Sequence, residues 1–277
     1  MEFLHGAIIL GQGDETGPVS FQTENGLKVV AACDEGYGRA KGNEDRVVLS
    51  PNVFAVIDGM GGLKNGEQAA AMVASCIEEN TDDVRKGLAD ADSLLKEYLR
   101  GSGAAVTALD VGPKSAEAHV VGDTKWIIHR QRTMFQRLLG HRMIPAFMRA
   151  SPDIEESKGH GVAQMLADKK IIRQDEVDGH RFAHTLNRYI GGNVSNPESR
   201  VLSFRPGDRL FLATDGLYGT VSVPELIALS NRLSLEDLMT EVWGLSDAYM
   251  RGTKERPDGK KPKWDNRSFI GIERITQ

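Results

Sequence analysis

Cysteine is scarce in this chain of 277 residues, which contains only Cys33 and Cys76, both in apolar surroundings. Two isolated cysteines cannot form a disulfide framework, so we expect two buried free thiols in a reducing compartment. No apolar run is long enough to span a bilayer. The first residues, with Glu2 and His5, lack the basic and apolar segments of a signal peptide. The sequence therefore predicts a cytoplasmic protein without a membrane partner.

Positive charge is not in excess either, because 34 Lys and Arg face 39 Asp and Glu, for a formal net charge of −5. This balance gives no overall reason to expect nucleic-acid binding, so a charged partner has to be recognised locally. The remaining composition, with 40% hydrophobic and 26% charged residues, is that of a globular protein large enough to bury a core.

The most informative stretch of the sequence is 53–70, VFAVIDGMGGLKNGEQAA. An apolar strand ends at Asp58, a glycine-rich turn follows, and an alanine-rich helix begins after Asn65. A carboxylate at a strand end, beside a backbone carbonyl that glycine leaves unhindered, suits a hard divalent cation such as Mg²⁺ or Mn²⁺. The alternative is an ordinary turn capped by Asp58. Convergence with other acids would decide between the two.

The strand that precedes this stretch carries acids at the matching end. Residues 47–49 and 53–57 are joined by a short Ser-Pro-Asn turn, which predicts an antiparallel hairpin. Such a hairpin brings Glu44 and Asp45 close to Asp58.

Two further strands place acids in the same way. The run RLFLAT at 209–214 leads directly into Asp215-Gly216. Asp265-Asn266 follows a polar, lysine-rich loop at 254–263 and precedes the final strand, 268–275. Gly122-Asp123 separates two strands and predicts a tight hairpin. The four acidic loci at strand ends are Glu44-Asp45, Asp58-Gly59, Asp215-Gly216 and Asp265-Asn266. They are enough for two octahedral cations that share a carboxylate, although each is also acceptable turn chemistry.

In this order the motifs resemble the metal-dependent serine/threonine protein phosphatase family (type 2C, PPM), particularly its bacterial branch. The segments that carry the resemblance are an arginine followed by Asn43-Glu44-Asp45, then FAVIDGMGG with Gly66-Glu67, Gly122-Asp123, GDRLFLATDGL and DNRSFIGI. They span nearly the whole chain. Some are weak individually, but the ordered set is highly specific.

The resemblance implies an α+β fold, a four-layer α/β/β/α sandwich with two central antiparallel sheets flanked by helices. It implies one phosphatase domain over 1–277, with a variable flap at about 131–190. The implied activity is hydrolysis of phosphoserine and phosphothreonine by a water bridging two Mn²⁺ or Mg²⁺ ions, without a phospho-enzyme. The implied partners are phosphorylated signalling proteins, a cognate serine/threonine kinase or its targets. A monomer is the default expectation.

The resemblance also assigns roles to residues. The implied metal-binding residues are Glu44, Asp45, Asp58, Gly59, Asp215 and Asp265. Asp58 would bridge the two ions and the Gly59 carbonyl would coordinate one of them. Glu44 would serve that ion mostly through water, with Asp45 in support, while Asp215 and Asp265 would hold the other.

Two other residues complete the expected site. Arg39 would grip the substrate phosphate through its planar fork of donors, and Asp123, with Asp215, would offer a weaker third metal site. One extra residue separates Arg39 from Glu44, so we expect that Lys41 or Arg46 shares the phosphate-binding role.

The sequence departs from the family pattern at other places. Met60 stands where some relatives have a histidine thought to protonate the leaving group. Gly159-His160-Gly161 replaces the usual Asp-His-Ser element, after a longer stretch than usual. The segment 130–149 is rich in arginine and aromatic residues, which fits either contact with a phosphorylated partner or, more commonly, a solvated helix face.

Two other functions were weighed. A non-catalytic regulatory module of the same fold is suggested by the altered flap, but all core metal positions are acids or glycine. A haloacid-dehalogenase-like phosphatase needs an Asp-x-Asp nucleophile, and Asp58-Gly59-Met60 lacks the second aspartate.

Overall fold

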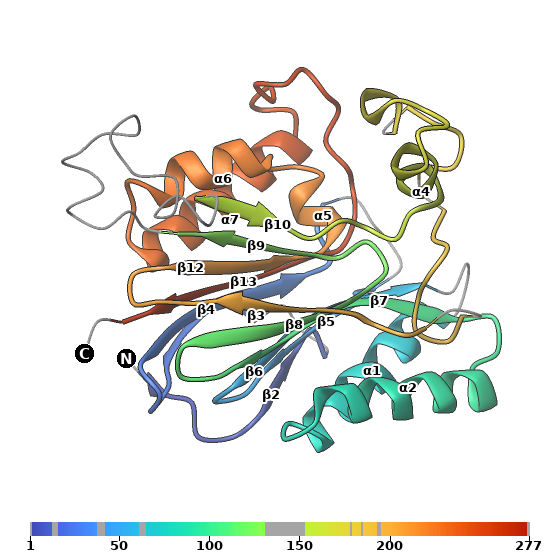
Figure 1. Ribbon diagram of the computed structural model, residues 1–277. Coiled ribbons are helices and arrows are strands. Elements are labelled where there is room, and N and C mark those ends of the chain that lie inside the picture. The colour runs from blue at the N-terminus through green and yellow to red at the C-terminus, as the bar shows by residue number, and fades with distance from the viewer. Residues whose placement is uncertain are drawn as a thin grey trace, which may run out of the picture.

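The computed structural model describes residues 2–12, 16–37, 42–60, 65–130, 153–177, 179–183, 185–192 and 195–275. These residues form two sheets that face each other, with helices packed on both outer faces (Figure 1). The expected four-layer α/β/β/α sandwich is therefore confirmed.

The described strands divide into a seven-stranded and a six-stranded sheet. In spatial order the first contains β1 (Glu2–Phe3), β3 (Thr16–Gln22), β4 (Leu27–Asp34), β13 (Arg267–Arg274), β12 (Arg209–Ala213), β9 (Lys125–His129) and β10 (Ile154–Glu156). The second contains β11 (Glu198–Ser203), β8 (Ser115–Val121), β7 (Gly103–Val111), β6 (Val53–Met60), β5 (Asp45–Leu49) and β2 (Ile8–Leu10). Apart from the parallel pair β1–β3, neighbouring strands run antiparallel.

Strand β6 shows why the sequence requires layers on both sides of a sheet. Phe54 and Val56 point into the core between the two sheets, whereas Val53, Ala55 and Ile57 point into a second core under the helices. All five side chains are fully buried. Because successive residues of a strand face opposite sides, an unbroken apolar run is stable only when both faces are covered.

Two pairs of helices supply that cover. Helices α1 (Gly66–Glu79) and α2 (Val84–Tyr98) lie on the six-stranded sheet, and α6 (Val223–Ser230) and α7 (Leu235–Met250) lie on the other (Figure 1). Short helices α4 (Val162–Asp168), α5 (Asp215–Tyr218) and the 3₁₀ turn η2 (Gln174–Glu176) lie outside these pairs.

Local chemistry explains where several of these helices begin. The Asp83 side chain accepts a hydrogen bond from the Lys86 amide at the start of α2, and Ser234 accepts one from Asp237 at the start of α7. At the start of α6, the Ser222 amide donates to the Glu225 carboxylate at 3.0 Å. These caps satisfy amide groups that have no partner inside a helix.

The structure corrects the expected hairpin at Gly122-Asp123. Strand β8 pairs with β7 and β11, whereas β9 pairs with β12 and β10, so this turn carries the chain from one sheet to the other. The turn between β11 and β12 also passes between sheets. Short turns look alike in sequence whether the next strand pairs with its predecessor or packs across from it.

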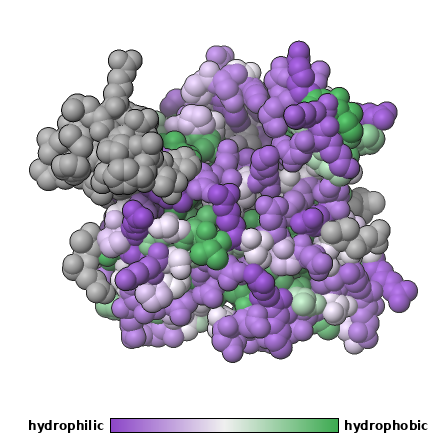
Figure 2. All heavy atoms as spheres, in the orientation of Figure 1, coloured by the Kyte–Doolittle hydropathy of each residue, from purple (hydrophilic) through white to green (hydrophobic). Residues whose placement is uncertain are grey.

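The face of the molecule seen in Figure 1 is mostly hydrophilic, with apolar residues in small separate patches (Figure 2). Within the described ranges, no helix combines the length and the apolar character that crossing a membrane would require.

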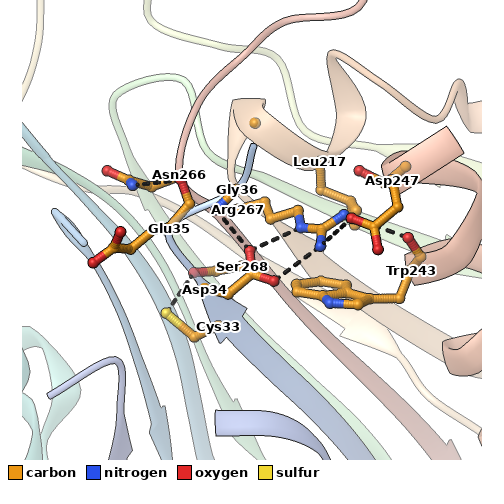
Figure 3. Close-up of polar contacts among 12 residues, drawn as sticks. Cys33, Asp34, Glu35, Gly36, Leu217, Trp243, Asp247, Asn266, Arg267 and Ser268 are labelled. Atoms are coloured by element: carbon orange, nitrogen blue, oxygen red, sulfur yellow. Dashed lines mark hydrogen bonds and ion pairs between the residues drawn. The ribbon is translucent and has the colours of Figure 1, made fainter. Parts of the chain in front are cut away.

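A buried ion cluster ties α7 to the edge where β13 begins (Figure 3). The Arg267 guanidinium, whose side chain is 4% exposed, forms two hydrogen bonds to the Asp34 carboxylate, at 2.8 and 2.9 Å. It also pairs with Asp247 at 2.7 Å and lies over the Trp243 ring. Two planar charged groups joined in this way fix both their separation and their orientation.

We expect Arg267→Met to lower the free energy of unfolding by about 3 kcal/mol, because it leaves the Asp34 carboxylate half-buried without its cation. Urea denaturation of the metal-free protein measures this. Asp247→Asn is the matched control; Asp247 is 37% exposed, so its loss should cost about 1 kcal/mol or less. Equal effects of the two variants would show that the Asp34 pair adds no stability.

Candidate functional site

The predicted hairpin of β5 and β6 forms, and it brings two of the expected acids together. Asp45 and Asp58 are direct cross-strand partners at the end of this hairpin. The Gly59 amide donates to the Glu44 carbonyl oxygen at 3.0 Å, which continues the ladder past Asp45. The register of one strand pair therefore places Glu44, Asp45, Asp58 and Gly59 at one edge of the sheet.

Glycine is required next to these acids because the first turn of α1 packs directly on β6. A Cβ atom built on Gly59 would lie 2.0 Å from the Gly66 carbonyl oxygen. One built on Gly66 would lie 2.5 Å from a Glu44 carboxylate oxygen and 2.8 Å from the Gly59 carbonyl oxygen. The Glu44 carboxylate and the Gly59 carbonyl thus lie side by side at the start of α1, as the ligand prediction requires.

The Asp45 carboxylate is held by two hydroxyl groups from the opposite sheet. Thr214 donates to Asp45 Oδ2 at 2.7 Å and Ser268 donates to the same oxygen at 2.8 Å. Sequence reasoning missed both residues. A signal was present, since Thr214 directly precedes Asp215 and Ser268 is two residues beyond Asn266, on the same face of its strand.

Asp215 and Asp265 come from the seven-stranded sheet and meet at a shared lysine. Asp215 is the first residue of α5, directly after β12, and Asp265 lies just before β13. The Lys263 ammonium pairs with Asp215 Oδ2 and lies 3.1 Å from Asp265 Oδ2. The lysine-rich loop gave no indication that one of its lysines would enter the acidic cluster.

Asp123 joins the cluster because its turn passes between the sheets. The Tyr218 hydroxyl donates to the Asp123 carbonyl oxygen at 2.8 Å, and the His160 amide donates to the Gly122 carbonyl oxygen at 2.7 Å. A Cβ built on Gly159 would lie 3.4 Å from the Asp123 Cα. The segment that departs from the family pattern is therefore the one that packs against Asp123.

The electrostatics show how closely these acids lie. Burial raises the pKa of Asp58 well above its ordinary value, and the charges of Asp45, Asp215 and Asp123 raise it further. Burial also raises the pKa of Asp45 to about 7, against the effect of its two hydroxyl donors. Burial and the Asp215 charge raise the pKa of Asp123 to about 7. Like charges gathered in a buried site disfavour ionisation, so the cluster requires a cation to stay charged near neutral pH.

Asn266 organises the loop that approaches the cluster from β4. Its amide nitrogen donates to the Glu35 carbonyl oxygen at 3.0 Å (Figure 3). The same nitrogen donates to the Gly42 carbonyl oxygen at 3.3 Å, and the amide oxygen accepts from the Glu44 amide. Glu35 and Gly42 stand on either side of residues 38–41. Arg39 and Lys41 themselves lie outside the described residues.

Arg46 is not arranged as a phosphate ligand. Its guanidinium is buried, donates to the carbonyl oxygens of Asn43 and Asp45 at 2.7 Å each, and pairs with Glu67 at 3.0 Å. The alternative assignment of Arg46 to substrate binding is therefore wrong, because these contacts commit it to holding the loop that carries Glu44.

Both cysteines are free and buried, as expected. Cys33 Sγ accepts a hydrogen bond from Asn43 Nδ2 at 3.2 Å and lies 3.2 Å from Ser268 Oγ, whose hydrogen is donated to Asp45. Burial and the nearby Asp45 charge raise the pKa of the Cys33 thiol to about 12. A thiol that stays protonated is no nucleophile, so Cys33 packs beside the site without taking part in its chemistry.

The donor chemistry of the cluster fits a divalent cation. Carboxylate and carbonyl oxygens are the ligands that Mg²⁺ and Mn²⁺ prefer, and Asp215 Oδ1 is buried without a hydrogen-bond partner. With the side chains as they stand, no three acidic, histidine or cysteine groups in the described part of the chain are arranged to hold a metal ion. Among the described residues, the Lys263 ammonium is a cation in contact with both Asp215 and Asp265.

No protein-family model matches the chain. It is 27% identical over 232 residues to the serine/threonine protein phosphatase PstP of Mycobacterium tuberculosis, an alignment that covers 75% of this chain and 41% of PstP. The chain thus spans less than half the length of the curated relatives that it matches.

Solved structures have the same fold. The crystal structure of M. tuberculosis PstP superposes with a TM-score of 0.70 at 22% identity, over 90% of this chain and 99% of that one. The PstP catalytic domain with two manganese ions gives 0.67 at 22% identity, over 90% and 99%. The PPM phosphatase MsPP of Mycobacterium smegmatis gives 0.64 at 20% identity, over 90% and 98%.

The resemblance carried by the ordered motifs is therefore confirmed: the chain is similar in sequence to the serine/threonine protein phosphatase PstP, and it shares the fold of bacterial PPM serine/threonine phosphatases.

Proposed function

We propose that this protein is a metal-dependent phosphatase of phosphoserine and phosphothreonine in proteins. The observation that carries the proposal is the convergence of Asp45, Asp58, Asp123 and Asp215 at one end of the two sheets. Burial and neighbouring carboxylates raise the pKa of Asp45, Asp58 and Asp123. Several carboxylates gathered in a buried site bind divalent cations well. The structure of the related PstP catalytic domain contains two manganese ions.

We assign the ligands as the sequence predicted. Asp58 would hold both ions, the Gly59 carbonyl and Glu44 one of them, with Asp45 in support, and Asp215 and Asp265 the other. Asp123 would add a weaker third site together with Asp215. The support is the register of β5 with β6 and the position of Asp215 and Asp265 on the facing sheet.

When bound, two Mn²⁺ or Mg²⁺ ions acidify a water and neutralise charge on phosphoryl oxygens. The chain's own part is to keep the acids in place. Thr214 and Ser268 orient Asp45, and Asn266 holds both sides of the segment that contains Arg39, the residue we assign to the substrate phosphate. The inert Cys33 thiol favours direct hydrolysis over a thiol nucleophile.

The broader assignments remain our proposals. We infer that the substrates are phosphorylated signalling proteins, a serine/threonine kinase or its targets, and that the protein acts in the cytoplasm as a monomer. We also infer one domain over 1–277 with a flap at about 131–190, of which 131–152 lie outside the described residues. The non-catalytic alternative is disfavoured because every predicted acidic ligand is present.

We expect Asp58→Asn to lower kcat/KM for a phosphothreonine peptide in Mn²⁺ by about a hundredfold or more, since it removes the carboxylate shared by both ions. A chelator should abolish the wild-type activity. Phosphate release measures both effects.

Asp110→Asn is the matched control, because Asp110 pairs with Val53 at the other end of β6 and is exposed. It should retain wild-type activity. Peptide hydrolysis that persists both in the chelator and in the Asp58 variant would exclude the two-ion mechanism.

The raised pKa values also predict how the metal-free protein responds to pH. Asp45 and Asp123 have a pKa of about 7 in the folded state, against about 4 in the unfolded chain. The folded state therefore holds protons more tightly, so these groups lower the free energy of unfolding as pH rises from about 4 to about 7. Urea denaturation across this range in a chelator should show the decline. The decline of the free energy of unfolding with pH should be shallower in Asp45→Asn, and it should be weaker for wild type in excess Mn²⁺. An identical slope in wild type and in Asp45→Asn would contradict the assignment of a raised pKa to Asp45.

A further inference from the structure

Lys263 occupies an unusual place for a loop lysine. Its ammonium pairs with Asp215 and Asp265, the two acids that we propose as ligands of one metal ion. It is also attracted by the charge of Asp58. Burial acts to lower the pKa of Lys263, but the charges of Asp215 and Asp265 raise it more, so this side chain is a permanent cation.

The backbone directs the lysine into the cluster. The Lys263 amide donates to the Gly219 carbonyl oxygen at 3.4 Å, and Arg256 donates to the same oxygen. Gly219 follows the last residue of α5, and Asp215 is the first, so about one helical turn, or about 6 Å, separates the anchor from the carboxylate. A lysine side chain spans that distance.

Gly219 also makes room for the aliphatic stem. A Cβ built on Gly219 would lie 2.9 Å from the Lys263 Cβ and 3.5 Å from its Cδ. The stem thus lies along a surface that a larger residue would fill. The contact with the acids is therefore part of the local packing, as well as an attraction of opposite charges.

We propose that Lys263 is a built-in counter-ion that takes the place of one divalent cation between Asp215 and Asp265 and has to withdraw before that cation binds. This inference rests on the proposed function only in taking these acids as cation ligands.

The exchange is physically reasonable in both directions. A single ammonium balances part of the charge of Asp58, Asp215 and Asp265. A divalent ion would balance more of this charge and would also bind Asp215 Oδ1, which Lys263 leaves unpaired. The Lys263 side chain is 31% exposed, so its flexible stem has a route to solvent. A site that is closed by its own cation for part of the time binds metal with a lower apparent affinity.

The test is titration calorimetry of the full chain with Mn²⁺, without substrate. We expect Lys263→Met to bind the weaker of the two ions about tenfold more tightly than wild type, as for a site that is open about a tenth of the time. Lys263→Arg keeps the cation and should stay close to the wild-type affinity. Lys261→Met removes the same charge from an exposed position in the same loop and should leave it unchanged.

Thermal unfolding provides a second measurement, which distinguishes a change in Mn²⁺ affinity from a folding defect of the variant. In a chelator, Lys263→Met should melt below wild type, because Asp215 and Asp265 lose the positive charge of Lys263. In saturating Mn²⁺ the two melting temperatures should converge.

Equal Mn²⁺ affinity in wild type and Lys263→Met would overturn the inference, even if both hydrolyse phosphopeptides. A raised KM for the phosphopeptide at unchanged Mn²⁺ affinity would also overturn it, and would assign Lys263 to the substrate phosphate. Absence of Mn²⁺ binding in wild type and in Lys263→Met would instead refute the proposed function.

Discussion

Mutual repulsion among buried carboxylates is the constraint on which the rest of this site depends. Asp45 and Asp58 face each other across a strand pair, and the charges of Asp215 and Asp123 reach both the pair and each other. Such a cluster opposes folding unless rigid elements hold it and a cation balances it. The apolar layers above and below each sheet provide the rigidity, and the proposed divalent cations would provide the balancing charge.

The acids meet because the chain changes sheets at this end of the sandwich. Asp45 and Asp58 belong to the six-stranded sheet. Asp215 follows β12 and Asp265 precedes β13 of the other sheet, and Asp123 lies in a turn between the two sheets. Hydrogen bonds from Thr214 and Ser268 to Asp45 then fasten the two sheets to each other at the acids themselves. The packing of the two sheets therefore also sets the positions of the acids. A change in the spacing between the sheets would displace these acids first.

The sequence was sufficient to predict the strands and the acids at their ends. It was insufficient to predict which sheet each strand joins. Apolar runs ending in Asp-Gly revealed the strand ends, and the short turn after β5 predicted the register that pairs Asp45 with Asp58. The turn at Asp123 was misjudged because local turn chemistry carries no information about which sheet the next strand joins. Thr214, Ser268 and Lys263 escaped notice for a related reason: hydroxyl and ammonium groups are common on surfaces, and only tertiary structure aims them at a carboxylate.

The cations near the cluster show which parts of the site are scaffold and which can move. Arg46 and Arg267 have side chains 3% and 4% exposed, and each is held by several oxygens in a planar geometry. Moving either arginine side chain away would leave carbonyl or carboxylate groups buried without partners. Neither side chain can therefore withdraw from its position in the folded protein. Within the described part of the chain, the Lys263 ammonium pairs with two carboxylates, and its side chain is 31% exposed. Arginine builds fixed geometry, whereas lysine provides a point charge that another cation can replace; the choice of residue at each position therefore separates the frame of the site from the part that can give way to a metal ion.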